Sequence, residues 1–216
     1  VHDLLGRMHE LAAILRARRF QRGSLELSLR ETKIDLDTNG QVCGAHLVEN
    51  TESHQMIEEF MLAANEAVAE MLQDREFLFL RRIHESPAPP KLKDLTNFVR
   101  ELGLDAHNLK NRFELQQVLD RVRGLPQAHA VNYAVLRSMQ KAIYSPHQEG
   151  HYALASDCYC HFTSPIRRYP DLTVHRLLDA ILGSKRPSQN LGRMLIEGEH
   201  CSDREQRAAE AERELI

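Results

Sequence analysis

The stretch from residue 157 to residue 182 constrains the fold most, because a turn, two prolines and a long apolar run follow one another there. It begins as a short extended segment, and Thr163, Ser164 and Pro165 then predict a turn. Ser164 is a residue type preferred at a helix N-cap, and Pro165 suits the first helical position because its missing N–H would have no partner there. The sequence therefore predicts a helix that begins at Ser164, with a kink or brief break at Pro170.

Two arginines and a tyrosine follow this turn directly. Arg167, Arg168 and Tyr169 would occupy the first turn and a half of the helix, where backbone N–H groups are free and the helix dipole is positive. Guanidinium groups and free amides together favour an anionic, oxygen-rich ligand, and phosphate is the natural candidate. The alternative is that both arginines are solvated or form salt bridges. A pair of arginines alone does not decide between the two readings.

The same stretch resembles a known signature. Residues 161–172 (HFTSPIRRYPDL), with His175 and Arg176 after them, resemble the signature of the ribonuclease II / ribonuclease R family of 3′-to-5′ exoribonucleases. Residues 57–65 (IEEFMLAAN) resemble that family's Glu-Glu-x-Met-x-x-Ala-Asn helix, and residues 200–208 (HCSDREQRA) resemble its late helix. The resemblance extends over the whole chain in the right order, and it implies part of the family's RNB catalytic domain.

The resemblance implies a reaction and a catalytic residue. Members of the family hydrolyse single-stranded RNA from its 3′ end to nucleoside monophosphates, with a divalent metal, expected to be Mg²⁺, that activates water and offsets phosphate charge. By its match to the motif, Arg167 is the expected catalytic residue and would contact the scissile phosphate. Arg168 and Tyr169 would support it or contact the RNA backbone. Ser164 would fix the direction of the helix amides through its cap.

Three further residues are carried over by the resemblance as RNA or phosphate contacts. Glu58 and Asn65 belong to the helix that borders the RNA channel, with Glu58 close to the terminal nucleotide. Glu205 matches a family glutamate near the channel. The alternatives are a solvated helix face for Glu58 and Glu59, and a helical salt bridge for Glu205. Which of the two neighbouring glutamates faces RNA stays open.

The metal ligands of the family are expected outside this sequence. The family's closely spaced aspartates lie upstream of the matched part, and no Asp-x-Asp-Asp run occurs here. We therefore expect residues 1–216 to be a partial RNB catalytic domain, without the aspartate cluster and the flanking RNA-binding barrels. Such a piece would be inactive alone, and the full-length enzyme is expected to be a monomer. Two other functions stay open: RNA binding without cleavage, and a helical scaffold or interaction domain.

Two patterns that could suggest other metals are disfavoured by their surroundings. Cys158 and Cys160 would share one face of a strand while His161 points to the other, which does not form a zinc site. Residues 35–40 (DLDTNG) match the first half of a calcium-binding loop, but predicted strands flank them where helices are needed. A hairpin turn is the better interpretation, and we expect no metal ligand in this chain.

Composition limits the partners and the compartment. The 216 residues are 42% hydrophobic and 27% charged, as in ordinary soluble domains. The net charge of −3 does not indicate a polyanion partner, so RNA would bind a local basic patch. No apolar run is long enough to span a membrane and no signal peptide is present. Four cysteines without a CxxC pair fit a reduced, cytoplasmic setting.

Periodicity predicts a helix-rich α+β fold with about six helices. Helical spacing of apolar residues is found over residues 1–19, 51–75, 91–103, 108–123, 126–139 and 189–215, besides the helix after the turn. Alternation predicts a small antiparallel meander with strands at 25–29, 34–36 and 41–47, with a hairpin turn at 38–40. An apolar run at 76–83 predicts a further buried strand, and residues 141–156 are expected to form a loop.

Overall fold

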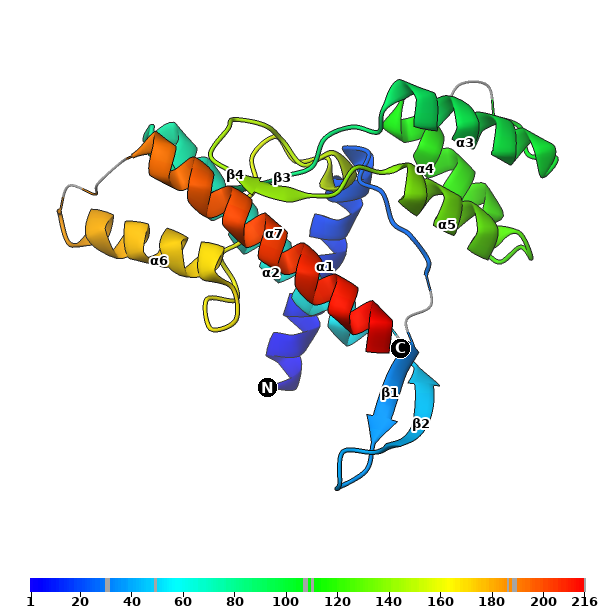
Figure 1. The fold of residues 1–216 in the computed structure, drawn as a ribbon, viewed down its shortest axis with the longest axis horizontal. Coiled ribbons are helices and arrows are strands. Elements are labelled where there is room, and N and C mark those ends of the chain that lie inside the picture. Colours follow the sequence, from blue (N-terminus) through cyan, green and yellow to red (C-terminus); the bar gives the residue numbers. More distant parts are fainter. Residues whose placement is uncertain are drawn as a thin grey trace.

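The chain folds into a helix-rich α+β structure (Figure 1). The computed structural model describes residues 1–29, 32–48, 50–106, 109, 111–185, 187 and 190–215. The helices are α1 His2–Gln21, α2 Glu52–Asp74, α3 Pro89–Glu101, α4 Arg112–Val122, α5 Ala128–Ser138, α6 Tyr169–Leu182 and α7 Leu191–Leu215, with a short 3-10 turn at Tyr152–Leu154. The strands are β1 Thr32–Leu36, β2 Val42–Leu47, β3 Arg81–Ile83 and β4 Ile143–Ser145. The predicted fold class is confirmed, while the predicted helix starts at Asn108 and Gln189 lie outside the described residues.

Helices α1 and α2 pack against each other, and a buried ion pair joins them. Glu59 is 3% exposed and accepts hydrogen bonds from Arg19 Nε at 3.1 Å and Nη2 at 2.5 Å. Arg19 Nη1 also donates to Ser24 Oγ at 2.9 Å. Because a buried carboxylate is costly without such partners, the pair fixes which faces of the two helices meet. Among the described residues, no helix is both long and apolar enough to cross a membrane.

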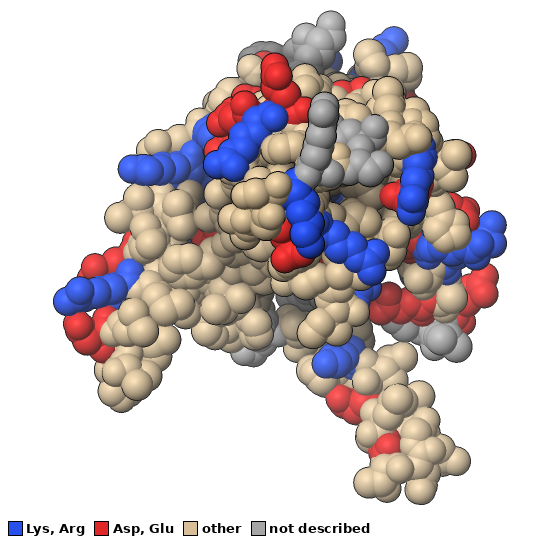
Figure 2. All heavy atoms as spheres, turned by 90° about the vertical axis from the view of Figure 1, so that its left-hand side faces the viewer, with Lys and Arg blue, Asp and Glu red and all other residues tan. Residues whose placement is uncertain are grey.

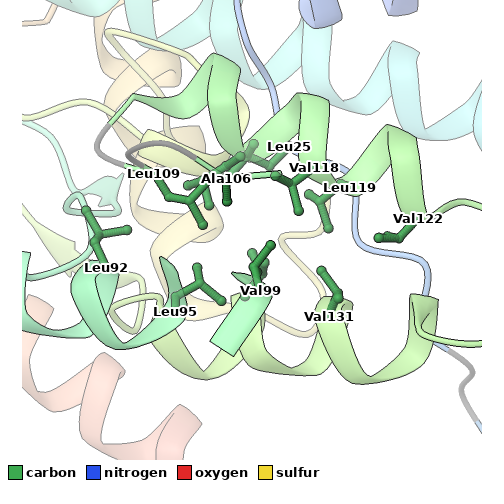
Figure 3. Packing of buried hydrophobic residues seen from close by; sticks show 12 residues of the cluster. Leu25, Leu92, Leu95, Val99, Ala106, Leu109, Val118, Leu119, Val122 and Val131 are labelled. Atoms are coloured by element: carbon green, nitrogen blue, oxygen red, sulfur yellow. The ribbon is translucent and has the colours of Figure 1, made fainter. Parts of the chain in front are cut away.

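Helices α3, α4 and α5 form a separate helical unit with its own apolar core (Figure 3). Leu115 and Val122 of α4 and Val131 of α5 are fully buried there, within the helices predicted over residues 108–123 and 126–139. Leu25 also packs into this cluster. It does so from an irregular segment, so the predicted strand at 25–29 is wrong. Leu25 and Leu27 bury their side chains against the helices, so this segment needs no partner strand.

Strands β1 and β2 form a two-stranded antiparallel hairpin, not a three-stranded meander. Its turn is held locally, because Asp37 Oδ1 accepts hydrogen bonds from the N–H groups of Asn39 and Gln41, both at 2.8 Å. Gly40 has φ +78°, the left-handed conformation that the predicted hairpin turn needs. The hairpin projects away from the helices (Figure 1), and most of its side chains are exposed.

A second pair of short strands joins two segments that are distant in the sequence. β3 pairs with β4 in antiparallel register, from Arg81 opposite Ser145 to Ile83 opposite Ile143. The N–H of Arg82 donates to the Tyr159 carbonyl at 2.9 Å, which brings the segment after residue 157 to the same place. The predicted strand at 76–83 is therefore shorter than expected. The predicted loop at 141–156 contains a strand.

Candidate nucleic-acid interface

The turn after His161 is tighter than predicted, and its helix begins later. The N–H groups of Arg167 and Arg168 both donate to the Ser164 carbonyl, at 3.3 and 3.1 Å. Helix α6 begins at Tyr169 with Arg168 as its N-cap and Pro170 in its first turn. The predicted helix start at Ser164 and the predicted kink at Pro170 are therefore wrong. Proline lacks an N–H and fits a helix only in its first turn, so Pro170 sets where this helix starts.

A fully buried carboxylate holds this turn from inside. Asp171 is 0% exposed, and its Oδ1 accepts hydrogen bonds from the Ser164 N–H and from Arg168 Nη2, both at 2.8 Å. Ser164 thus takes part through its backbone N–H and not through the predicted side-chain cap. Arg168 is 18% exposed and is bound in this ion pair. The salt-bridge alternative raised for the arginine pair therefore describes Arg168.

Asn65 of α2 holds the segment that leads into the turn. It is 2% exposed. Its Oδ1 accepts from the N–H groups of Phe162 at 2.9 Å and Thr163 at 3.2 Å, and its Nδ2 donates to the Tyr159 hydroxyl at 2.8 Å. His175 adds a hydrogen bond to the Phe162 carbonyl at 2.9 Å. Asn65 therefore lies behind the turn and positions it, and its predicted contact with RNA stays a prediction.

These buried contacts leave the tip of the turn exposed. Ile166 is 101% exposed and Tyr169 is 46% exposed, and the Arg167 side chain is exposed between them. Arg167 has no ion pair within the part of the chain that the structure describes. The turn thus presents a free guanidinium group from a backbone that three other side chains hold in place.

A groove of about 780 Å³ runs between this turn and helix α7. Its walls carry both charge and apolar surface, from Tyr144, Arg167, Arg168, Tyr169, Pro170, Ile196, Glu197, His200, Cys201, Arg204, Glu205 and Ala208. Helix α7 is docked on β4 at Gly198, where an added Cβ would lie 2.6 Å from the Tyr144 carbonyl oxygen. Ser202 Oγ accepts the Tyr144 N–H at 2.9 Å from the next turn of the helix. The wall formed by α7 is therefore fixed by close contact with the strand.

Glu205 lies on the groove but is already paired. Its Oε2 is 2.6 Å from Arg82 Nη1, and this contact crosses from α7 to β3. The predicted alternative of a salt bridge is found, although between two elements and not within one helix. Arg82 also lies over the Tyr144 ring, 4.5 Å from its centroid. The contact of Glu205 with RNA stays a prediction.

Neutral aromatic and imidazole side chains lie behind Tyr144, which lines the groove. The Tyr144 hydroxyl and His161 Nδ1 are hydrogen-bonded at 2.8 Å. Burial, with Arg168 nearby, lowers the pKa of His161 to about 3, and burial raises the pKa of Tyr144 to about 12. His151 stacks edge-on to Tyr159, and burial lowers its pKa to about 3 as well. Tyr144, His161 and His151 therefore stay neutral at physiological pH and add no charge beside the groove.

The two glutamates of the predicted Glu-Glu pair have different environments. Glu59 is buried in the ion pair with Arg19. The side chain of Glu58 is 47% exposed and its Oε1 lies 3.8 Å from Arg19 Nη2. Glu58 is therefore the accessible one, but it does not belong to the residues that line the groove. Its predicted position beside the terminal nucleotide stays a prediction.

Sequence reasoning missed several residues of this site. Asp171 lies within the recognised signature, but the signature does not say that its carboxylate binds the turn. Arg82 and Tyr144 come from β3 and β4, and no sequence pattern connects them to α7. For Arg204, the only sequence evidence of a role was its position next to the predicted Glu205.

The described residues supply no metal cluster. No group of three or more His, Cys, Asp or Glu side chains is placed to hold a metal ion in the described part of the chain. Cys158 and Cys160 are both buried, and burial raises the pKa of each thiol, for Cys160 to about 12. A hard cation such as the Mg²⁺ that the resemblance implies needs several carboxylate oxygens. The described residues of this chain do not bring such a set of oxygens together.

Charge on one face of the molecule is mixed and not broadly basic. On the face shown in Figure 2, Lys and Arg side chains are scattered among Asp and Glu side chains and uncharged surface. This agrees with the net charge of −3. An anionic ligand would therefore depend on particular unpaired arginines and not on a general positive field.

A family model and the related sequences assign the chain to the same family. The family model described as "RNB domain" matches residues 1–184. Ribonuclease R of Thermotoga maritima is 41% identical over 224 residues, which cover 99% of this chain and 31% of that protein. Ribonuclease R of Escherichia coli K12 is 33% identical, over 98% of this chain and 28% of that protein. The chain spans about a third of the length of these relatives.

Solved structures give the same result for the fold. Mycoplasma genitalium RNase R, in complex with ribose-methylated single-stranded RNA, matches with a TM-score of 0.84 and 31% identity, over 94% of this chain and 32% of that one. Yeast Ssd1, described as a pseudonuclease, shares the fold with a TM-score of 0.70 and 23% identity, over 91% of this chain and 25% of that one. By its sequence match over most of its length and by its structure, the chain belongs to the RNB domain family.

Proposed function

We propose that this chain is the C-terminal part of the RNB catalytic domain of a 3′-to-5′ exoribonuclease, which hydrolyses single-stranded RNA to nucleoside monophosphates. The observation that carries the proposal is the exposed Arg167, which is unpaired within the described residues and lies at the tip of a turn bound by Asp171 and Asn65. The names of the relatives support the reaction, and the RNA complex of the Mycoplasma protein supports the substrate. The proposed enzyme is a cytoplasmic monomer.

In this proposal Arg167 contacts the scissile phosphate. A guanidinium group offers several N–H donors to phosphate oxygens, and a fixed backbone keeps them in place while charge builds up in the transition state. Arg168 acts indirectly, because its ion pair with Asp171 helps to hold the turn. Tyr169, at the start of α6, offers a half-exposed ring to the RNA beside Arg167.

Magnesium would be bound outside the described residues of this chain. When bound, it would activate the attacking water and stabilise charge on the phosphate. The chain shown here contributes the other half of the task, which is to bind and orient the phosphate. We therefore propose that the 216-residue chain has no nuclease activity alone and needs the upstream aspartates of the longer protein.

The test is digestion of a 5′-labelled single-stranded RNA by the full-length protein and by the 216-residue chain, with magnesium. We expect the full-length protein to shorten the RNA stepwise from its 3′ end and the 216-residue chain to be inert. Arg167→Ala should lower the single-turnover rate about a hundredfold or more, since loss of one charge-stabilising donor commonly costs 10²–10³. Arg207→Ala, on the exposed surface of α7, serves as the matched arginine control.

Two results would contradict the proposal. A full-length protein that binds RNA but never shortens it would be an RNA-binding member of the family, an alternative kept open by the pseudonuclease that shares this fold. An Arg167→Ala variant that cuts at the normal rate would show that the turn is not the phosphate-binding element, even if the protein is a nuclease.

A further inference from the structure

Helix α7 carries an arginine that differs from its neighbours. The other arginines of this helix bind groups one turn away, in the pairs Arg193–Glu197 at 2.8 Å, Arg207–Asp203 at 3.1 Å and Arg213 with the Ala209 carbonyl at 3.1 Å. Arg204 has no ion pair or hydrogen bond with any described residue. It is exposed and lies on the wall of the groove.

The sequence of the helix explains why Arg204 is left free. Residues four positions apart lie on one face of a helix, so Arg204 has His200 and Ala208 as neighbours and no carboxylate at either position. Glu205 follows directly, but it is bound to Arg82. The same face, with Ile196 one turn further back, is the one that lines the groove.

The opposite wall of the groove carries the second free guanidinium group. Arg167 is exposed there and unpaired among the described residues, whereas Arg168 beside it is bound by the buried Asp171. Three arginines line the groove, Arg167, Arg168 and Arg204, and the two without a partner among the described residues come from different walls. An RNA strand in this groove would meet one cation from the turn and one from α7.

We propose that Arg204 is a second phosphate-binding residue, which holds a backbone phosphate of the RNA other than the one at Arg167. His200, one turn before it, offers a ring N–H to the same strand. This inference rests on the proposed function, because it takes RNA as the ligand of the groove. It also replaces Arg168 as the expected partner of Arg167: the second contact comes from a helix distant in sequence and not from the adjacent residue.

The first test is the salt dependence of RNA binding by the full-length protein, measured by fluorescence anisotropy with magnesium left out. Each phosphate contact with a single strand contributes a slope of about 0.7 to the dependence of log affinity on log salt. Arg204→Ala should lower the slope by about that amount and weaken binding several-fold at low salt, while Arg204→Lys keeps the slope. Arg207→Ala, an arginine of the same helix that does not line the groove, should leave both unchanged.

The second test locates the phosphate. RNA oligonucleotides in which one linkage at a time is an uncharged methylphosphonate are bound to the unmodified protein and to the Arg204→Ala and Arg167→Ala variants. We expect one linkage whose neutralisation weakens binding to the unmodified protein but not to Arg204→Ala, and a different linkage with this behaviour for Arg167→Ala. Non-additivity of this kind identifies a direct pair.

The outcomes separate this inference from the proposed function. If the full-length protein degrades RNA and the salt slope of Arg204→Ala is unchanged, the inference is overturned and the nuclease assignment stands. If both arginines show their linkages but no RNA is degraded, the groove binds RNA as inferred and the nuclease assignment fails. If both variants respond to the same linkage, Arg204 assists Arg167 at one phosphate and there is no second site.

Discussion

Two tight turns of this molecule are built in opposite ways. The hairpin turn between β1 and β2 is held by Asp37, whose carboxylate binds N–H groups within the same turn. The turn after His161 is held by Asn65 from α2 and by Asp171 from α6, both buried. The first is a local structure that the hairpin can form alone. The second exists only when distant elements are packed together, and it is the one that presents an arginine with no ion pair among the described residues.

The largest effect expected from a single side chain comes from removing the buried carboxylate. Asp171→Ala leaves Arg168 without its partner and the Ser164 N–H without an acceptor, so we expect the free energy of unfolding to fall by about 3 kcal/mol. Asp171→Asn keeps an acceptor and should lose less. Asp37→Ala makes the same change in the hairpin turn, where water can replace the contact, and should leave stability nearly unchanged. Urea unfolding of the three variants measures the difference, and equal losses for Asp171→Ala and Asp37→Ala would contradict the comparison.

The second effect is a dependence of stability on pH, which comes from buried histidines next to the turn. His161 and His151 have pKa values of about 3 in the folded chain, below the ordinary value of 6.5. Between these values the unfolded chain binds protons that the folded chain does not, so stability is complete above pH 6.5 and falls as the pH drops. At pH 5 each histidine should cost about 2 kcal/mol relative to pH 8.

Urea unfolding at pH 8 and pH 5 measures this dependence. His161→Gln keeps a polar side chain beside Tyr144 but does not titrate, so it should remove about 2 kcal/mol of the difference in stability between the two pH values. An unaltered difference in this variant would show that His161 is not the group responsible.

A third effect, with the lowest lower limit, concerns the wall of the groove. Gly198→Ala places a Cβ 2.6 Å from the Tyr144 carbonyl oxygen, so α7 must move away from β4 at a cost of about 1–3 kcal/mol. Gly192→Ala lies in the same helix with only the Asn190 side chain near, at 3.6 Å, and should be neutral or slightly stabilising, since alanine favours helices by about 1 kcal/mol. Thermal unfolding of both variants checks the expectation, and a stabilised Gly198→Ala would contradict the close docking.

The sequence predicted the elements that depend on local signals. The helix of residues 51–75 follows from its apolar stripe, and the hairpin follows from the turn at residues 38–40. The predicted strand at 25–29 failed because Leu25 finds its apolar surroundings among helices. β4 was missed because three residues that pair with a distant strand leave no periodic pattern.

The candidate site was predictable only in part, because its side-chain pairs also join elements that are distant in the sequence. The residues in the signature could be named, and Arg167 is exposed at the turn. Arg168 and Glu205 are paired, while Arg204 has no partner among the residues that the structure describes. This difference depends on Asp171, Arg82 and the register of α7 on β4. Such pairings are set by tertiary packing, and no spacing in the sequence contains them.

The contact of Asn65 with Phe162 also has a consequence for the order in which the chain folds. The two residues are 97 positions apart, and the amide of Asn65 is synthesised long before the segment that it binds. Closing so long a loop is slow compared with forming a helix, so the turn should acquire its shape in one of the last folding steps. Until then the Asn65 amide is hydrogen-bonded to water, and newly made protein would contain α2 before it had the turn that presents Arg167.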